Sequence, residues 1–190
     1  MWTTPALPCE GIGRARSGHY LAGMHLHTEM RIAVPASRAW AVLGERFGHI
    51  GEWATPIERS SLAGDPRSGA VRTCHIARFG PVARGVVRER LVEYEPAAMR
   101  FIYEAVEGLP SFIGRASNRW TVAPDGPEHC FVSSHAELQL LGAMRLLALP
   151  LRWRMRADSA KVLKDLRHFL ERGEAHPRKR RALSGAERAS

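Results

Sequence analysis

The chain has 190 residues, a length that suits one domain with a substantial core and is short for two. Hydrophobic residues make up 45% of the sequence and charged residues 25%, a globular balance that excludes wholesale disorder. The formal net charge is +9, and no uninterrupted apolar run is long enough to cross a bilayer.

Residues 1–23 are rich in Pro and Gly and lack the continuous apolar segment of a secretory signal, so they are predicted to form a flexible leader. The three cysteines are Cys9, Cys74 and Cys130. They cannot all pair with one another, and none lies in a CxxC motif. This pattern favours reduced thiols and a cytoplasmic protein.

The next segments predict strands joined by turns. A first strand is expected over Leu26–Val34, and Pro35 then opens a helix that later glycines break into short pieces. Six further strand-like segments follow, each ending in a Gly- or Pro-containing turn. Their ranges are 57–62, 70–78, 83–94, 100–106, 114–122 and 130–139. Short connections between consecutive strands indicate an antiparallel meander.

From Leu141 onward the hydrophobic period becomes helical. Apolar residues between Met155 and Leu170 recur at helical spacing, and the amphipathic helix is expected to end near Gly173. Pro150 is expected to separate it from the preceding apolar stretch. The order of elements predicts an α+β domain over residues 24–172, in which a curved antiparallel seven-stranded sheet wraps around the long C-terminal helix.

Residues 173–190 are predicted to form a basic disordered tail that carries +3 of the net charge. Its run Arg178–Arg181 could contact an anionic membrane or nucleic acid. The simpler alternative is a solvated tail, because one basic run is a weak motif. The sequence does not indicate an oligomeric state.

Alternation along the strands predicts which side chains point inward. If the turn at Gly80-Pro81 centres a hairpin, Arg72 pairs with Glu89 and Cys74 with Val87. The face that these four residues share is the more apolar one and is predicted to be inside. Its residues are unusually small, which predicts a cavity rather than a tight core. The small inward positions are Ala70, Ala105, Gly114, Ala116, Ser134 and Ala136.

Several polar side chains share this inward parity. The predicted polar groups of the cavity are Arg72, Glu89, Tyr103, Asn118 and Ser134. A buried charge is costly unless it is paired, so Arg72 and Glu89 are expected to neutralise each other. A purely structural ion pair and a role in orienting an apolar ligand both remain open.

The segment Ile32–Leu43 resembles the opening of the START-like (SRPBCC) superfamily, and its polyketide cyclase/dehydrase and lipid-transport branch is the nearest match. The pattern continues with Trp53 and Pro56, then Gly69–Arg72 and Glu89–Leu91. Tyr103 and the terminal amphipathic helix complete it. The resemblance covers about residues 29–171.

The resemblance implies the helix-grip fold and an internal cavity for lipids, polyketides, sterols or hormones. The plant hormone receptors of this superfamily are similar from Glu89 to Gly108 without gaps. That similarity implies that Glu89 is a ligand-contacting carboxylate and that Tyr103 and Ala105 line the cavity. The chain departs from those receptors at two positions. Ser134 stands where they have a second carboxylate on the last strand, and the position of their lysine on the second strand falls near Glu58 in this chain.

Two functions are therefore predicted. The first is a carrier or sensor for a small hydrophobic ligand, and the alternative is a polyketide cyclase-type enzyme. The predicted ligand-contacting residues are Trp53, Arg72, Glu89, Tyr103, Asn118, Trp120 and Ser134. Candidates for a general acid or base, or for stabilising an enolate, are Glu89, Tyr103 and Arg72.

No cofactor is predicted, because the sequence has no phosphate loop or nucleotide fingerprint. No metal site is predicted either. The adjacent pairs Cys74-His75 and His129-Cys130 point to opposite faces of a strand, so each pair offers at most one ligand to a site.

Overall fold

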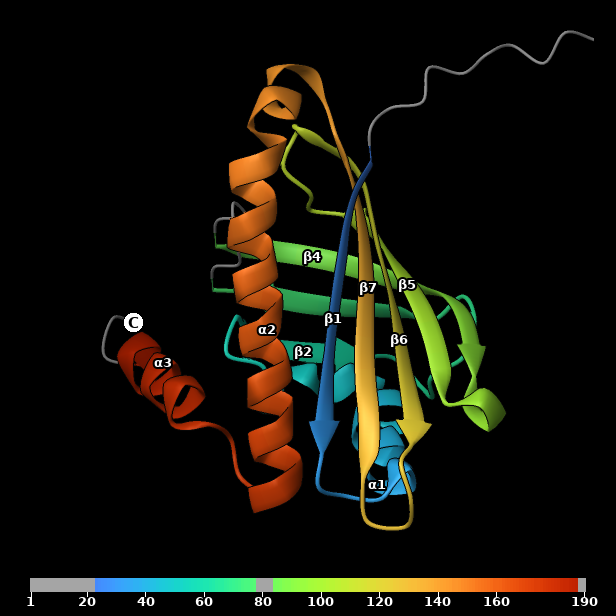
Figure 1. Cartoon of the computed structure of the whole chain (residues 1–190). Coiled ribbons are helices and arrows are strands. Elements are labelled where there is room, and N and C mark those ends of the chain that lie inside the picture. Colours follow the sequence, from blue (N-terminus) through green and yellow to red (C-terminus); the bar gives the residue numbers. More distant parts are fainter. Residues whose placement is uncertain (1–22, 78–83, 188–190) are drawn as a thin grey trace, which may run out of the picture.

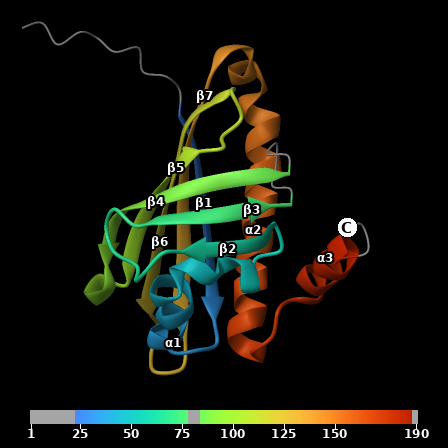
Figure 2. The same cartoon turned by 180° about the vertical axis from the view of Figure 1, so that it is seen from behind.

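The computed structural model describes residues 23–77 and 84–187, so the predicted leader lies outside the described residues apart from Gly23. Seven antiparallel strands form one sheet in the order β1-β7-β6-β5-β4-β3-β2. The sheet curls around the long helix α2, and β2, β3 and β4 cross behind that helix (Figures 1 and 2). The strands are β1 (Gly23–Ile32), β2 (Ile57–Leu62), β3 (Val71–Ile76), β4 (Gly85–Glu95), β5 (Arg100–Glu107), β6 (Ile113–Pro124) and β7 (Cys130–Leu140).

This architecture confirms the predicted fold class, with seven antiparallel strands and a long C-terminal helix. The hairpin register is also as predicted, because Arg72 lies opposite Glu89 and Cys74 opposite Val87. Burial alternates along β3 with the predicted parity. One prediction of parity is wrong: Gly114 is exposed, because the register shifts between Ile113 and Arg115. Ile113 is the buried residue there.

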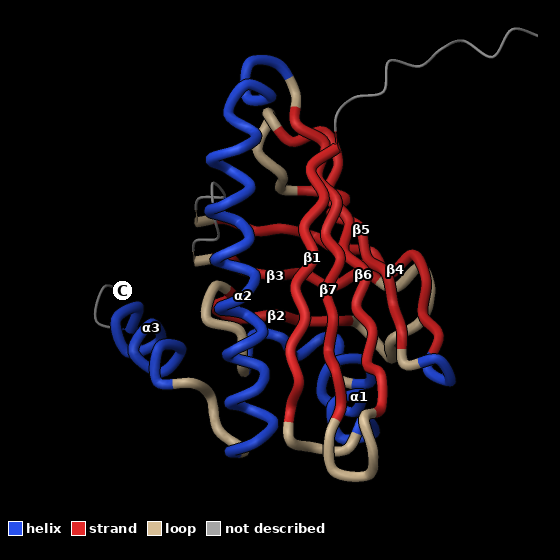
Figure 3. The backbone as a smooth tube through the Cα atoms, in the orientation of Figure 1, coloured by secondary structure: helices blue, strands red, loops and turns tan. Residues whose placement is uncertain are grey.

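Short helical segments close one end of the curved sheet (Figure 3). They are α1 (Ala36–Trp40), η1 (Ala41–Glu45) and η2 (Phe47–Glu52), and the shorter turns η3 (Pro96–Ala98) and η4 (Gly142–Leu147) lie later in the chain. Ser60 ties η2 to β2, since its hydroxyl donates to the Gly48 carbonyl at 2.7 Å and accepts from the Gly51 N–H at 2.9 Å. Phe47, which begins η2, is buried against Phe101 of β5.

Helix α2 runs from Ala148 to Arg172 and lies across the concave face of the sheet. Pro150 does not separate it from the preceding stretch, which corrects the prediction. It lies in the first turn, where the backbone N–H groups make no hydrogen bond within the helix, so the missing N–H of proline costs nothing there. The helix ends as predicted at Gly173, which adopts a left-handed φ of 76°.

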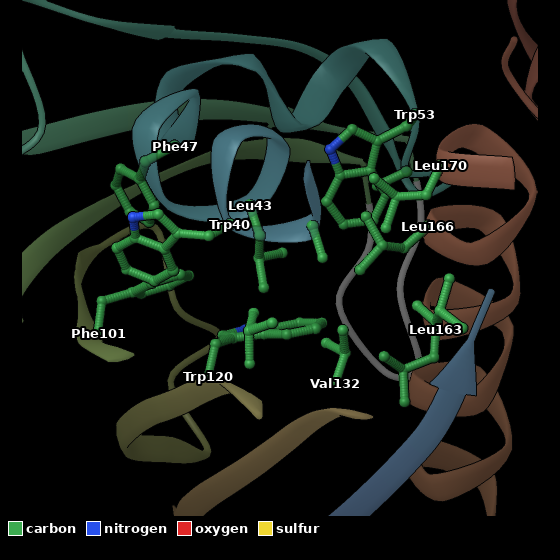
Figure 4. Packing of buried hydrophobic residues seen from close by; sticks show 14 of the residues in the cluster. Trp40, Leu43, Phe47, Trp53, Phe101, Trp120, Val132, Leu163, Leu166 and Leu170 are labelled. Atoms are coloured by element: carbon green, nitrogen blue, oxygen red, sulfur yellow. The ribbon is translucent and has the colours of Figure 1, made fainter. Parts of the chain in front are cut away.

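The main apolar core fills the end of the sheet that the short helices close. Trp40, Leu43 and Phe47 point toward Phe101 and Trp120 of the sheet, and Leu163, Leu166 and Leu170 approach from α2 (Figure 4). A second, smaller cluster lies toward the other end of the sheet. It consists of Met24, Leu26, Ile113, Leu138, Leu140 and Met155. The space between the sheet and the middle of α2 lies between these two clusters.

The predicted disordered tail is wrong for residues 177–187, which form helix α3 (Pro177–Glu187) beside α2. Lys179 is completely buried, and its ammonium group donates to the carbonyl of Ile57. Arg178 reaches the fully buried carboxylate of Asp165 at 2.8 Å. The basic run thus has partners within the chain, which a charge count along the sequence could not reveal. None of the described helices is long and apolar enough to span a bilayer.

Candidate functional site

A cavity of about 130 Å³ lies between the concave face of the sheet and α2. We call it the sheet–helix cavity. Most of its lining is apolar, and its polar groups come from strands β3, β4, β5, β6 and β7 and from Ser159 of α2. The lining residues are Leu26, Ile50, Ala54, Pro56, Ile57, Arg72, Ile76, Glu89, Tyr103, Asn118, Trp120, Ser134, Ala136, Met155, Ser159 and Val162.

Six of the seven predicted ligand-contacting residues line this cavity. Trp53 is the exception. It is buried in the main core, where Figure 4 shows it beside Leu166 and Leu170 of α2. The long C-terminal helix was expected to close the cavity, but none of its side chains was among the predicted ligand-contacting residues. Met155, Ser159 and Val162 follow one another at helical spacing, and this i, i+4, i+7 pattern is the signal that could have identified them.

Arg72 and Glu89 form a cross-strand ion pair at the polar wall. The Arg72 Nε and Nη2 atoms lie 2.9 and 2.5 Å from the same Glu89 oxygen, Oε2. Arg72 Nη1 donates to the Phe47 carbonyl at 2.7 Å. A guanidinium has five N–H donors and these contacts use three, so two N–H groups of Arg72 have no partner among the described residues. Arg72 also lines the cavity.

Aromatic rings hold the guanidinium flat against the wall. Its carbon Cζ lies 3.8 Å from the ring centre of Phe47 and 5.1 Å from that of Tyr103. Burial is the largest single effect and lowers the pKa of Arg72, but the charge and hydrogen bond of Glu89, together with smaller contributions from Cys74 and Tyr103, raise the pKa overall. Arg72 is therefore a fixed cation at every physiological pH.

A hydrogen-bonded chain crosses β5, β6 and β7 next to this pair. The Ser134 hydroxyl donates to Asn118 Oδ1 at 2.9 Å, and Asn118 Nδ2 donates to the Tyr103 hydroxyl oxygen at 3.4 Å. No described residue accepts the Tyr103 hydroxyl proton within hydrogen-bond distance, so it is available to an acceptor in the cavity. Burial, followed by the charge of Glu89, raises the pKa of Tyr103 to about 12, so the phenol stays protonated near neutral pH.

Cys74 lies beneath the ion pair and is not activated. Its thiol is buried and donates to Glu89 Oε2 across 3.4 Å. Burial raises the pKa of Cys74 to about 12, so the nucleophilic thiolate is scarce at neutral pH. The described residues contain no group of three or more metal-ligating side chains.

The model of the family described as polyketide cyclase/dehydrase and lipid transport matches residues 24–171. Among solved structures, the chain is similar to the ZhuI aromatase/cyclase of Streptomyces sp. R1128, with 17% identity and a TM-score of 0.66, over 80% of this chain and 95% of that one. No curated protein matches the chain by sequence.

Norcoclaurine synthase from Thalictrum flavum, in complex with dopamine and hydroxybenzaldehyde, has 16% identity and a TM-score of 0.61, over 91% of this chain and all of that one. A solution structure from Thermobifida fusca has 26% identity and a TM-score of 0.63, over 80% of this chain and 97% of that one. At 16–17% identity, the likeness to these two enzymes shows a common fold alone.

Proposed function

Because the chain belongs to the polyketide cyclase/dehydrase and lipid transport family, we propose that it binds a small, mostly apolar ligand in the sheet–helix cavity, as a carrier or sensor. The observation that carries this proposal is a cavity of about 130 Å³ with apolar walls and one polar wall. We further infer a reducing, cytoplasmic setting, because Cys74 and Cys130 are buried free thiols.

The volume and the donors define the ligand class. An apolar protein cavity of about 150 Å³ is known to hold one benzene ring, so this cavity suits a single ring or a short chain segment. The hydroxyl proton of Tyr103 and the remaining N–H groups of Arg72 both seek an acceptor. The ligand is therefore an apolar molecule that presents one oxygen acceptor to the polar wall.

Titration with p-cresol and toluene, followed by NMR, tests this proposal. We expect p-cresol to bind more tightly than toluene, because its oxygen meets the donors of Tyr103 and Arg72. Ala136→Leu fills the cavity and is expected to weaken both ligands, whereas Ala123→Leu on the exposed end of β6 leaves them unchanged. Binding that is absent, or unaffected by Ala136→Leu, contradicts the proposal.

The alternative is a cyclase-type enzyme that uses the same cavity. The position of Tyr103 favours it, because a protonated phenol beside a fixed guanidinium can polarise a substrate carbonyl. Two structural neighbours have enzyme names, aromatase/cyclase and norcoclaurine synthase, although the likeness to them extends only to the fold.

Incubation with a linear poly-β-ketone distinguishes the two functions. If the chain is a cyclase, Tyr103→Phe is expected to lower the rate of ring closure about 100-fold or more while p-cresol still binds. Tyr94→Phe is the matched control, since Tyr94 stacks on Trp40 in the core and does not line the cavity. If wild-type protein leaves the polyketone unchanged, the carrier or sensor remains.

A further inference from the structure

The start of helix α2 exposes large apolar side chains to solvent. Trp153 is 75% exposed and Leu149 is 69% exposed, and Leu146 in the preceding turn η4 is 87% exposed. Isolated exposed leucines are ordinary in soluble proteins, but several large apolar groups within eight residues form a patch that usually has a partner.

Arginines lie on the same face of the helix. Arg152 follows Leu149 by three residues and Arg156 follows it by seven, which puts both on the side that carries Leu149 and Trp153. We call Leu146, Leu149, Trp153, Arg152 and Arg156 the α2 patch. Met155 and Leu151 occupy the opposite side and pack against the smaller core cluster. The first turns of α2 are therefore apolar on two faces, and only one of them is covered by the protein.

The charge around the patch has a single sign. Four arginines and no acidic residue lie between Leu141 and Ala157. Arg154 pairs with Asp158 at 2.9 Å. Arg145, Arg152 and Arg156 take part in no ion pair among the described residues. Their charges are thus not balanced by a neighbouring carboxylate of the described chain.

We propose that the α2 patch docks the protein on an anionic membrane surface. Leucine and tryptophan side chains beside arginines are the composition of helices that lie in the lipid headgroup region. In this arrangement Leu149 and Trp153 enter the boundary between headgroups and acyl chains, and the arginines meet lipid phosphates. The inference does not depend on a ligand in the sheet–helix cavity, because the patch lies on the other side of α2.

Two other occupants fit the patch less well. A second copy placed symmetrically would bring the arginines of both copies together, which is electrostatically unfavourable without acidic partners. Nucleic acid would satisfy the arginines but would leave the leucines without an apolar partner. The basic run of α3 is also a poorer membrane contact than the patch. Arg178 is paired with Asp165, Arg180 with Glu174, and Lys179 is buried.

Vesicle flotation with the full chain tests the proposal. We expect flotation with vesicles of phosphatidylcholine and phosphatidylglycerol, and much weaker flotation with phosphatidylcholine alone or at high salt. The double variant Arg152→Gln/Arg156→Gln should weaken binding about 30-fold. Leu149→Ser/Trp153→Ser should weaken it at least about tenfold. These side chains are exposed, so the variants should keep the wild-type melting temperature.

Matched controls lie elsewhere on the surface. Val92→Ser removes an apolar side chain of 49% exposure from the outer face of the sheet. Arg167→Gln removes an exposed arginine from the distal half of α2. Both are expected to float like wild type. Brominated phosphatidylcholine mixed into the anionic vesicles should quench the tryptophan emission of wild-type protein, and this quenching should disappear in Trp153→Phe while flotation persists.

Several outcomes overturn the proposal. One is that wild-type protein does not float with anionic vesicles. Another is that the patch variants float as well as wild type. Self-association that the patch variants abolish, without any flotation, would assign the surface to a second copy. RNA binding that needs the arginines but not Leu149 and Trp153, again without flotation, would assign it to nucleic acid.

Discussion

Arg72 shows how one buried charge organises the polar wall. Its side chain is only 3% exposed, and Glu89, the Phe47 carbonyl and two aromatic rings surround it. Transfer of a guanidinium out of water is costly, so its stability in the fold depends on Glu89. The pair is therefore structural, and both of its residues also line the cavity. A structural role thus does not conflict with the proposed role in orienting a ligand.

Glu89→Gln is expected to destabilise the protein by about 3 kcal/mol, because Arg72 would keep its buried charge and lose the compensating carboxylate. The matched control is Glu107→Gln, which breaks the exposed pair with Arg88 and should cost less than about 1 kcal/mol. Urea denaturation of both variants measures the difference. Equal losses would show that burial does not distinguish the two pairs.

At the scale of elements, the strands could be predicted from the alternation of apolar and polar residues and from the turn residues between them. The range 57–62 of β2 is as predicted, and the paired register of β3 and β4 followed from the position of one turn. Predictions were wrong where local geometry departs from a regular period. Gly114 faces out because of a register shift, and Pro150 lies inside α2 because a first helical turn tolerates proline.

The connection after β5 depends on a glycine. Gly108 has a φ of 83°, and a Cβ atom there would lie 2.0 Å from the Val86 carbonyl oxygen of β4. Gly108→Ala therefore combines left-handed strain with a backbone clash that no side-chain movement relieves. Gly126 has a similar φ of 78° and open space around it, so Gly126→Ala isolates the strain alone.

We expect Gly126→Ala to cost about 1–2 kcal/mol of unfolding free energy, from left-handed strain alone. Gly108→Ala should cost at least about 1 kcal/mol more, because β4 and the turn must move apart. Thermal unfolding of the two variants gives the comparison. Similar losses in both would mean that the backbone around Gly108 adjusts freely.

At the scale of the whole molecule, the sequence predicted the sheet, the long helix and the polar wall, because periodicity and strand parity are local properties. It did not predict the contacts between distant segments. The carbonyl of Phe47 that Arg72 reaches, and the position of Trp53 in the core, depend on how η2 packs. Helix α3 was missed because a short, strongly basic segment resembles a solvated tail until Asp165 and the Ile57 carbonyl provide partners.

The attachment of α3 gives overall stability a dependence on pH. Burial lowers the pKa of Lys179 to about 8, well below its value of about 10.4 in an unfolded chain. Between these values the unfolded state binds more protons than the folded state, so stability rises as the pH increases. Below about pH 8 the buried ammonium carries its full unfavourable contribution, and this contribution is relieved as the pH rises through the window.

Lys179→Met should abolish this dependence, whereas Lys164→Met on the exposed face of α2 should keep it. Urea denaturation measures the unfolding free energy of each protein at pH 7, 8.5 and 10. The first pH lies below the window of about 8 to 10.4, and the other two lie within it. The difference between wild type and Lys179→Met is expected to shift in favour of wild type with increasing pH, because only wild type loses a buried charge. A difference that stays constant with pH would mean that Lys179 keeps an ordinary pKa in the folded protein. In that case α3 would be held mainly by the ion pair of Arg178 with Asp165.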